Sequence, residues 1–160
     1  MPDLTIHLLT TYIANHKLKL NPYFILVGGI FPDLLGRPLI ILLPQNYLFS
    51  WVSVLLHTPV PVFLLAYVAS LLFTEFNRKE VFAALSVGAL GHMLLDMTQK
   101  HYGDAYYWLF PFSFKTFDIP LLWSDEYILA IPVFAVAAGL IWVAKKYRYM
   151  KTLNHEIVKT

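Results

Sequence analysis

Histidine and aspartate residues stand inside or beside the apolar segments of this 160-residue chain. An aspartate near the middle of a bilayer costs about 2.5–3.5 kcal/mol on insertion scales, so ionisable residues in apolar helices indicate function by default. Four such residues are Asp33, His57, His92 and Asp96. His92 and Asp96 are four residues apart, which places them one turn apart on one face of a helix. The set offers nitrogen and oxygen ligands for a shared cation.

The absence of cysteine means that any metal would be held by His, Asp, Glu or other oxygen donors. Such ligands suit zinc, with manganese or iron as alternatives. A catalytic metal site keeps an open position, in which the pKa of bound water falls toward ~7 and a nucleophile is generated. We therefore expect a metal-dependent hydrolytic site in which Asp33 and Asp96 bridge metal ions or orient that water. His7 and His101 are further candidate ligands.

Each of these residues also has an ordinary structural interpretation. His92 and Asp96 could be a hydrogen-bonded pair in a core, His57 could be a packed histidine, and Asp33 after Pro32 could belong to a turn or a helix cap. A buried series of His and Asp can also relay protons, so the alternative is a non-enzymatic ion or proton conduit, or a scaffold for a partner. Side-chain atoms within ~5 Å of a shared centre would favour a metal site over these alternatives.

Arg37 lies four residues after Asp33 and has two interpretations: it binds a phosphate, or it extends toward the lipid headgroups. His16 and His155 stand in charged segments, where solvated side chains are the simpler expectation.

The composition indicates that much of the protein's surface faces lipid. Hydrophobic residues make up 58% of the chain and charged residues only 14%, against about 25% in soluble domains. The length suits a single domain covering residues 1–160. The net charge of +2 excludes the broad basic surface of a nucleic-acid-binding protein. The expected partner is therefore the lipid bilayer, and the sequence identifies no protein partner.

Three long apolar segments predict the main helices. The clearest membrane span is Tyr127 to Ala144, which has no charged residue and approaches the roughly 20 residues that cross a bilayer. The segment from Tyr47 to Phe73 is long enough to span but is interrupted by the sequence HTPVP at His57 to Pro61. In the third segment, Val81 to Met97, small residues suggest a face for close helix contact, namely Ala84, Gly88 and Gly91.

The first 46 residues predict broken or re-entrant helices. Leu4 to Asn15 favours a helix, Tyr23 to Phe31 is a short apolar run that should end at Pro32 and Asp33, and Leu39 to Leu43 is a second short run. A long aromatic loop is expected at residues 100–126, where its rings suit the headgroup layer. The predicted fold class is thus all-α: a multi-pass membrane helical bundle.

Positive charge gathers directly after the last span and in the 74–80 loop, which places both on the cytoplasmic side of a cell's inner membrane. The aromatic loop then lies on the opposite face. On this arrangement His57, His92 and Asp96 share the outer half of the bilayer.

The candidate residues occur in a series of motifs: TIHLL with His7, GGIFPDLLG with Asp33, LLHTPV with His57, LGHMLLDMTQKHYG with His92 and Asp96, and WLFPFS at residues 108–113. Over about residues 4–115 the series resembles the YdjM-like family of LexA-binding, inner-membrane-associated metal-dependent hydrolases. The chain departs from that pattern before the central histidine, where it has SVLLHTPVP in place of an Arg-Gly approach.

The YdjM-like family is in turn distantly similar to zinc-dependent phospholipases C, which are all-helical enzymes that cleave phosphodiesters. The resemblance implies a metal-site core at about residues 4–115 and a phosphoester substrate such as a phospholipid. It also implies that Asp33 bridges metals or acts as a general base. The implied metal ligands are His7, Asp33, His57, His92 and Asp96, with His101 as an addition.

Overall fold

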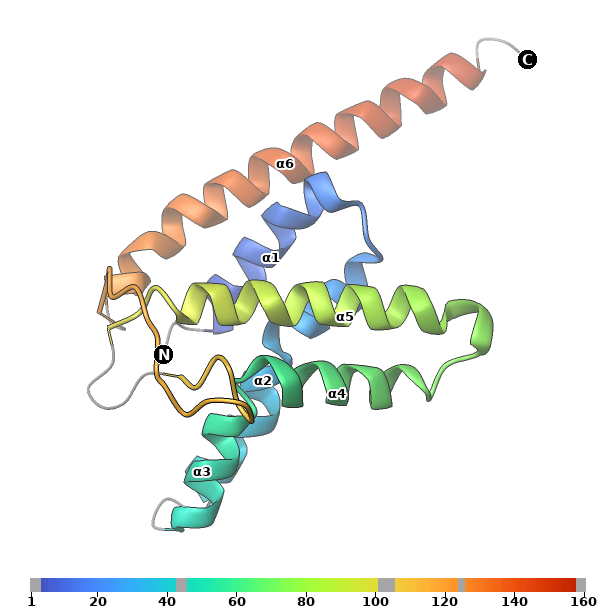
Figure 1. Cartoon of the computed structure of the whole chain (residues 1–160). Coiled ribbons are helices and arrows are strands. Elements are labelled where there is room, and N and C mark those ends of the chain that lie inside the picture. The colour runs from blue at the N-terminus through green and yellow to red at the C-terminus, as the bar shows by residue number, and fades with distance from the viewer. Residues whose placement is uncertain (1–3, 43–45, 101–105, 124–125, 158–160) are drawn as a thin grey trace.

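The computed structural model describes residues 4–42, 46–100, 106–123 and 126–157. Within these ranges the chain forms six helices and no strand, apart from one isolated bridge between Gln99 and Leu122. The predicted all-α class is confirmed (Figure 1). The helices are α1 (Leu4–Leu18), α2 (Pro22–Leu42), α3 (Tyr47–Leu55), α4 (Pro59–Ser70), α5 (Glu75–Asp96) and α6 (Glu126–Ile157).

Helices α2 and α5 form the centre of the bundle because two glycines let their backbones touch. A Cβ atom added at Gly28 would collide with the carbonyl oxygen of Leu85, and one added at Gly88 would collide with the carbonyl oxygen of Ile25. The predicted small-residue face is confirmed at Ala84 and Gly88, which are both buried, and Gly88 lies in this contact. It is wrong at Gly91, which is exposed and whose added Cβ would meet nothing within 4 Å.

Helix α2 runs unbroken from Pro22 to Leu42, so the predicted end at Pro32 and Asp33 is wrong. The apolar run that begins at Leu39 is the last part of the same helix. Pro32 lacks the N–H that would bond to the carbonyl of Gly28, a loss that normally breaks a helix. Here Pro32 is buried, and the packing of Gly28 against α5 holds the segment helical.

The predicted interruption of the next segment is confirmed. Helices α3 and α4 meet at 79°, and His57 lies between them. Pro59 begins α4, where its missing N–H is harmless and its fixed φ favours a helix start. The bend therefore takes His57 off both helices and places it at a corner.

Helix α1 packs on α2 and α5, and α6 lies across α1, with its C-terminal part extending away from the body (Figure 1). The close approach of α1 to α2 depends on Gly29, where a Cβ would collide with the side chain of Thr11. At the outer side of α1, the ammonium of Lys145 lies 5.3 Å from the ring centre of Tyr12.

The aromatic loop returns to the end of α5. The N–H of Ile119 donates to the carbonyl of Met97 at 2.8 Å, and that of Leu121 donates to the carbonyl of Thr98 at 2.9 Å. Trp108 packs against a core of Val62, Ala89 and Met93. The described part of the loop is thus packed on the bundle.

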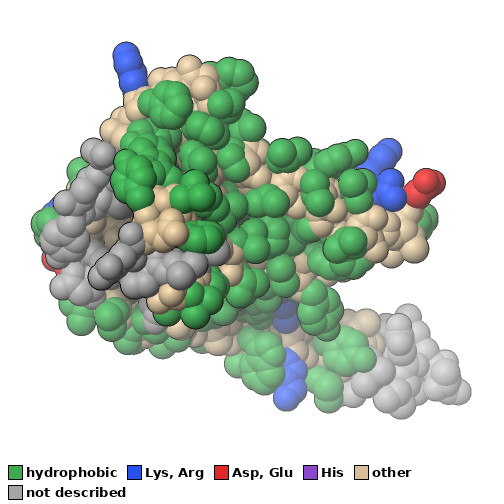
Figure 2. Space-filling model, turned by 90° about the horizontal axis from the view of Figure 1, so that it is seen from below, with side chains coloured by type: hydrophobic (Ala, Val, Ile, Leu, Met, Phe, Trp, Pro, Cys, Tyr) green, Lys and Arg blue, Asp and Glu red, His purple; other side chains and the backbone are tan. Residues whose placement is uncertain are grey.

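One helix among the described residues is long and apolar enough to cross a membrane, the part of α6 from Glu126 to Thr152. The predicted span at Tyr127 to Ala144 lies within it. The bent pair α3–α4 would be a second span if its two halves are counted as one. Large hydrophobic side chains are exposed on every helix, and they cover most of the face in Figure 2.

Candidate metal centre

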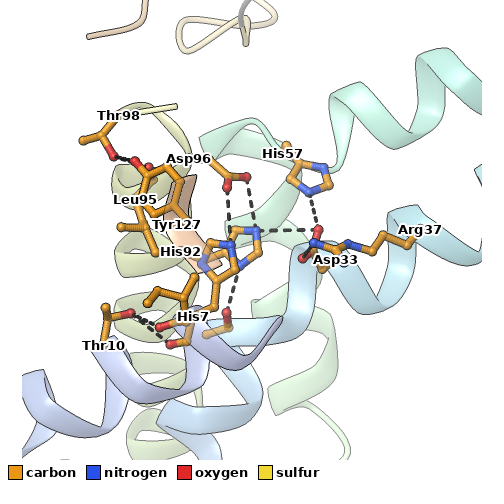
Figure 3. Close-up of polar contacts among 12 residues, drawn as sticks. His7, Thr10, Asp33, Arg37, His57, His92, Leu95, Asp96, Thr98 and Tyr127 are labelled. Carbon is orange, nitrogen blue, oxygen red and sulfur yellow. Dashed lines mark hydrogen bonds and ion pairs between the residues drawn. The ribbon is translucent and has the colours of Figure 1, made fainter. Parts of the chain in front are cut away.

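Five of the six predicted ligands converge at the centre of the bundle (Figure 3). His7 comes from α1, Asp33 from α2, His57 from the bend, and His92 and Asp96 from α5. All five are at most 2% exposed. The sixth, His101, lies outside the described residues. Residues up to 89 positions apart in the chain therefore share one buried polar cluster, which we call the His/Asp cluster.

Two carboxylates link the three histidines. Asp96 contacts His7 Nε2 through Oδ1 and His92 Nε2 through Oδ2, each at 3.3 Å. Asp33 Oδ1 lies 3.2 Å from His57 Nε2 and 4.0 Å from His92 Nε2. His92 therefore lies between the two carboxylates.

The donor atoms form two groups of a size that fits a metal ion. One group is His7, His92 and Asp96, and the other is Asp33, His57 and His92. Within each group the candidate ligand atoms lie within 4.8 Å of one another. Because Zn–N and Zn–O bonds are about 2.0–2.2 Å, atoms at this spacing can reach a common ion with small side-chain movements.

Backbone carbonyls fix the orientation of two of the rings. Nδ1 of His57 lies 2.8 Å from the carbonyl oxygen of Ser53, and Nδ1 of His92 lies 2.8 Å from that of Gly29. A carbonyl only accepts, so Nδ1 must donate, and in a neutral ring Nε2 then carries a lone pair. Metal-binding histidines are commonly oriented in this way.

This orientation aims lone pairs at carboxylate oxygens. Two acceptors 3.2 or 3.3 Å apart repel unless a proton or a cation lies between them. In addition, Nδ1 of His7 has no hydrogen-bond partner within the described part of the chain, and its Nε2 faces only the carboxylate of Asp96. Buried polar atoms are normally satisfied, so the donor set fits a bound cation.

A glycine makes room for His57 beside α2. A Cβ atom at Gly36 would lie 2.7 Å from Ser53 Oγ and 3.1 Å from His57 Cε1. The first contact is closer than Cβ atoms normally come and the second is tight, so any larger residue here would push Ser53 or His57 away from α2. The cluster thus depends on small residues that the sequence analysis did not connect with it.

Arg37 reaches the cluster from the outside. Its Nη2 lies 2.6 Å from Asp33 Oδ2, and its side chain is 28% exposed. Asp33 therefore contacts a histidine with one oxygen and a guanidinium with the other. The structure gives Arg37 a place beside the cluster from which it can meet an anion.

Tyr106 is a residue of the site that the sequence analysis missed. It is buried, and its ring stacks on that of His57 with centroids 5.4 Å apart and an interplanar angle of 11°. Burial raises the pKa of the Tyr106 hydroxyl well above its ordinary value, and the charges of Asp96 and Asp33 act in the same direction. The phenol therefore stays neutral and can donate a hydrogen bond. Its only signal in the sequence was its place in an aromatic run.

Comparison with known proteins places the chain in a family. A family model described as "YdjM inner membrane protein" matches residues 4–155, which include all five clustered residues and most of α6. No curated protein and no solved structure matches the chain. The match extends further along the chain than the motifs that predicted it, which ended near residue 115. The chain belongs to the YdjM inner membrane protein family.

Proposed function

We propose that this protein is a membrane-bound, metal-dependent hydrolase that acts on a phosphoester. The observation that carries the proposal is the convergence of three imidazoles and two carboxylates, from four parts of the chain, in two adjoining buried groups that share His92. Two of the rings are held with Nε2 facing inward. The proposed ion is zinc, with manganese or iron as alternatives, since the ligands are nitrogen and oxygen.

A bound divalent cation would lower the pKa of a water ligand toward ~7 and stabilise negative charge on a phosphoryl group. The chain's own residues supply the rest. Asp96 holds His7 and His92 in place through its two oxygens. Asp33 faces His57 and can accept the proton of an attacking water. Arg37, paired with Asp33 and partly exposed, is placed to bind a phosphate oxygen.

The compact arrangement favours a cation site over a conduit. A proton conduit needs polar groups spread along a path across the membrane. The clustered side chains instead form two adjoining groups that share His92, and all five are almost fully buried. We therefore place the conduit and the partner scaffold second.

For the membrane arrangement, we propose at least two crossings with the C-terminus in the cytoplasm. Helix α6 supplies one, and the bent α3–α4 pair would supply another. Basic residues orient α6, since they are retained on the cytoplasmic side. They are Lys145, Lys146, Arg148 and Lys151.

The test combines metal analysis with an activity assay on the full chain purified in detergent. We expect about one or two zinc, manganese or iron ions per chain. We also expect hydrolysis of bis(p-nitrophenyl) phosphate that a chelator abolishes and added metal restores. Asp33→Asn should lose the hydrolysis, whereas His16→Ala, which changes a histidine on α1 outside the cluster, should not.

Two results would count against the proposal. If the native protein neither contains nor takes up metal, the proposed cation site is ruled out. Metal binding without hydrolysis of any phosphomonoester or phosphodiester would leave a metal protein of another function.

A further inference from the structure

A cavity of about 420 Å³ lies between α1 and α5, close to the His/Asp cluster. Its volume falls within the ~300–1,000 Å³ of ordinary ligand pockets. Thr11 and Ala14 contribute to its wall from α1, and Gly91 and Leu95 contribute from α5. No charged residue lines it, and its surface is almost entirely apolar. We call this cavity the α1–α5 groove.

One end of the groove lies beside the cluster. Thr11 is one helical turn after His7, and Leu95 and Thr98 stand on either side of Asp96 in the sequence. In the view of Figure 3, Thr10 and Leu95 lie on one side of the stacked His7 and His92 rings, and Arg37 lies on the other. The groove and the arginine thus approach the cluster from different directions.

The other end lies at Leu18 and Val87. From Val87 to Asp96, where it ends, helix α5 rises roughly 14 Å at 1.5 Å per residue, and Thr98 lies two residues beyond that end. The hydrocarbon core of a bilayer is about 30 Å thick, so one leaflet contributes about half of that. The groove is therefore about as long as the hydrocarbon layer of one leaflet.

The rim of the groove is continuous with the apolar exterior. Leu90 and Leu94 line it and are 37% and 45% exposed. Thr98, at the cluster end, is hydrogen-bonded to the hydroxyl of Tyr127 at the start of the membrane-spanning helix α6. Its hydroxyl also donates to the carbonyl of Leu95, so it does not make the groove polar. A groove that opens onto an exposed apolar surface in this way suits a lipid chain.

We propose that the α1–α5 groove binds one acyl chain of a membrane phospholipid, with the phosphate of that lipid at the His/Asp cluster. The placement of the phosphate rests on the proposed function. The placement of the acyl chain rests on the groove's apolar lining, its length and its opening onto an exposed apolar surface. Charge complementarity supports the direction, because the cationic end of the arrangement, Arg37 and a bound metal, meets the anionic headgroup.

Gly91 offers a direct steric test. It lines the groove, and a Cβ atom there would meet nothing within 4 Å. A larger side chain at this position therefore starts from open space on the wall of the groove, and a leucine should occupy part of the groove. Gly139 on α6 has the same open surroundings but does not line the groove, so it provides a matched control. Ala14, which is exposed on α1, allows the groove to be filled from the opposite wall.

The experiment uses the full chain in vesicles of phosphatidylglycerol and phosphatidylethanolamine, with a trace of phosphatidylglycerol that carries a photoactivatable diazirine in its acyl chain. After illumination, the labelled peptides are identified by mass spectrometry. We expect labelling in α1 and α5 to fall about tenfold in both Gly91→Leu and Ala14→Leu, the equivalent of losing roughly two buried methylene groups. Gly139→Leu should label as the unchanged protein does. Metal content measured on each sample reports whether the cluster has formed.

Labelling of α1 and α5 that is equal in the unchanged protein and in both filled variants would overturn the inference, as would labelling spread evenly over α6. The labelling needs no turnover, so it separates the two proposals. If the filled variants lose labelling but the protein hydrolyses no phosphoester, the acyl-chain site is supported and the hydrolase proposal is refuted. If the protein hydrolyses bis(p-nitrophenyl) phosphate but Gly91→Leu and Ala14→Leu leave the labelling unchanged, the hydrolase proposal stands and the acyl-chain site is refuted.

Discussion

The imidazole rings of His7 and His92 stack face to face, with centroids 3.7 Å apart and an interplanar angle of 17°. Two imidazolium cations at this distance would repel each other strongly in a buried site. At least one of the two rings should therefore be neutral, with a lone pair available to a metal ion. The stack, which joins α1 to α5, thus favours a shared cation over a fully protonated histidine cluster.

Removal of the metal should destabilise the fold, because the ion binds the folded chain and not the unfolded one. At a free metal concentration of about 100 times the dissociation constant, the stabilisation is about 2.7 kcal/mol. We expect a chelator to lower the thermal unfolding midpoint of the detergent-solubilised protein by several degrees, as followed by circular dichroism. An unfolding curve that is the same with and without chelator would contradict this.

His92→Ala should weaken metal binding more than either His7→Ala or His57→Ala. His92 belongs to both candidate ligand groups, whereas each of the other two histidines belongs to one. Even the loss of a residue that supports a ligand costs 10- to 100-fold in metal affinity, so we expect a loss on the order of 100-fold or more for His92→Ala. Competition with a zinc-sensitive dye measures the affinities. Equal effects at all three positions would argue against His92 as the shared ligand.

Metal affinity should fall as the solution is acidified. An ordinary histidine has a pKa of about 6.5, and its protonated ring cannot bind a metal. Between pH 7.5 and pH 5.5 each histidine that must lose a proton adds up to about tenfold per pH unit to the loss of affinity. A series of zinc titrations across this range gives the slope. An affinity independent of pH would mean that carboxylates alone hold the ion.

Gly88→Ala should lower the stability of the bundle, whereas Gly91→Ala should not. The added methyl at position 88 collides with the backbone of α2 and forces α2 and α5 apart, at a cost of about 1–3 kcal/mol. At position 91 the methyl meets open space, and the higher helix propensity of alanine adds up to about 1 kcal/mol. Unfolding in denaturant measures both changes. Two glycines three residues apart should thus respond with opposite signs.

Tyr106→Phe should separate the ring of this residue from its hydroxyl. The phenylalanine keeps the stack on His57, so metal content should be retained, while loss of a neutral hydrogen-bond donor beside the carboxylates should slow hydrolysis by about tenfold or more. Tyr106→Ala removes the stack as well and should also weaken metal binding. Tyr107→Phe, which changes the neighbouring tyrosine that stacks on Trp51, is the control. Full activity in Tyr106→Phe would leave the residue a purely structural role.

The sequence predicted those features that depend on local pattern. Three such features needed no information on tertiary contacts. They are the apolar run of α6, the spacing of His92 and Asp96, and the interruption at HTPVP. The convergence of the histidines was an expectation from chemistry, since buried ionisable groups need partners. The structure brings five of the six candidates together.

What the sequence could not predict depends on packing between distant segments. A proline such as Pro32 normally ends a helix, but α2 continues past it where Gly28 packs against α5. Gly88 and Gly91 look alike in sequence, but one faces α2 and the other faces the open groove. Tyr106 was one aromatic residue among many, and its role follows from the path of a loop that has no periodic pattern.

The two stacking contacts of the aromatic loop have a mechanical consequence. Tyr106 stacks on His57 at the bend. The next residue, Tyr107, stacks on Trp51 of α3, with ring centroids 5.8 Å apart and an interplanar angle of 6°. Two consecutive tyrosine rings thus contact the bend and helix α3 at the same time. Loss of either ring should therefore loosen the corner that carries His57, even though neither tyrosine belongs to the candidate ligand groups.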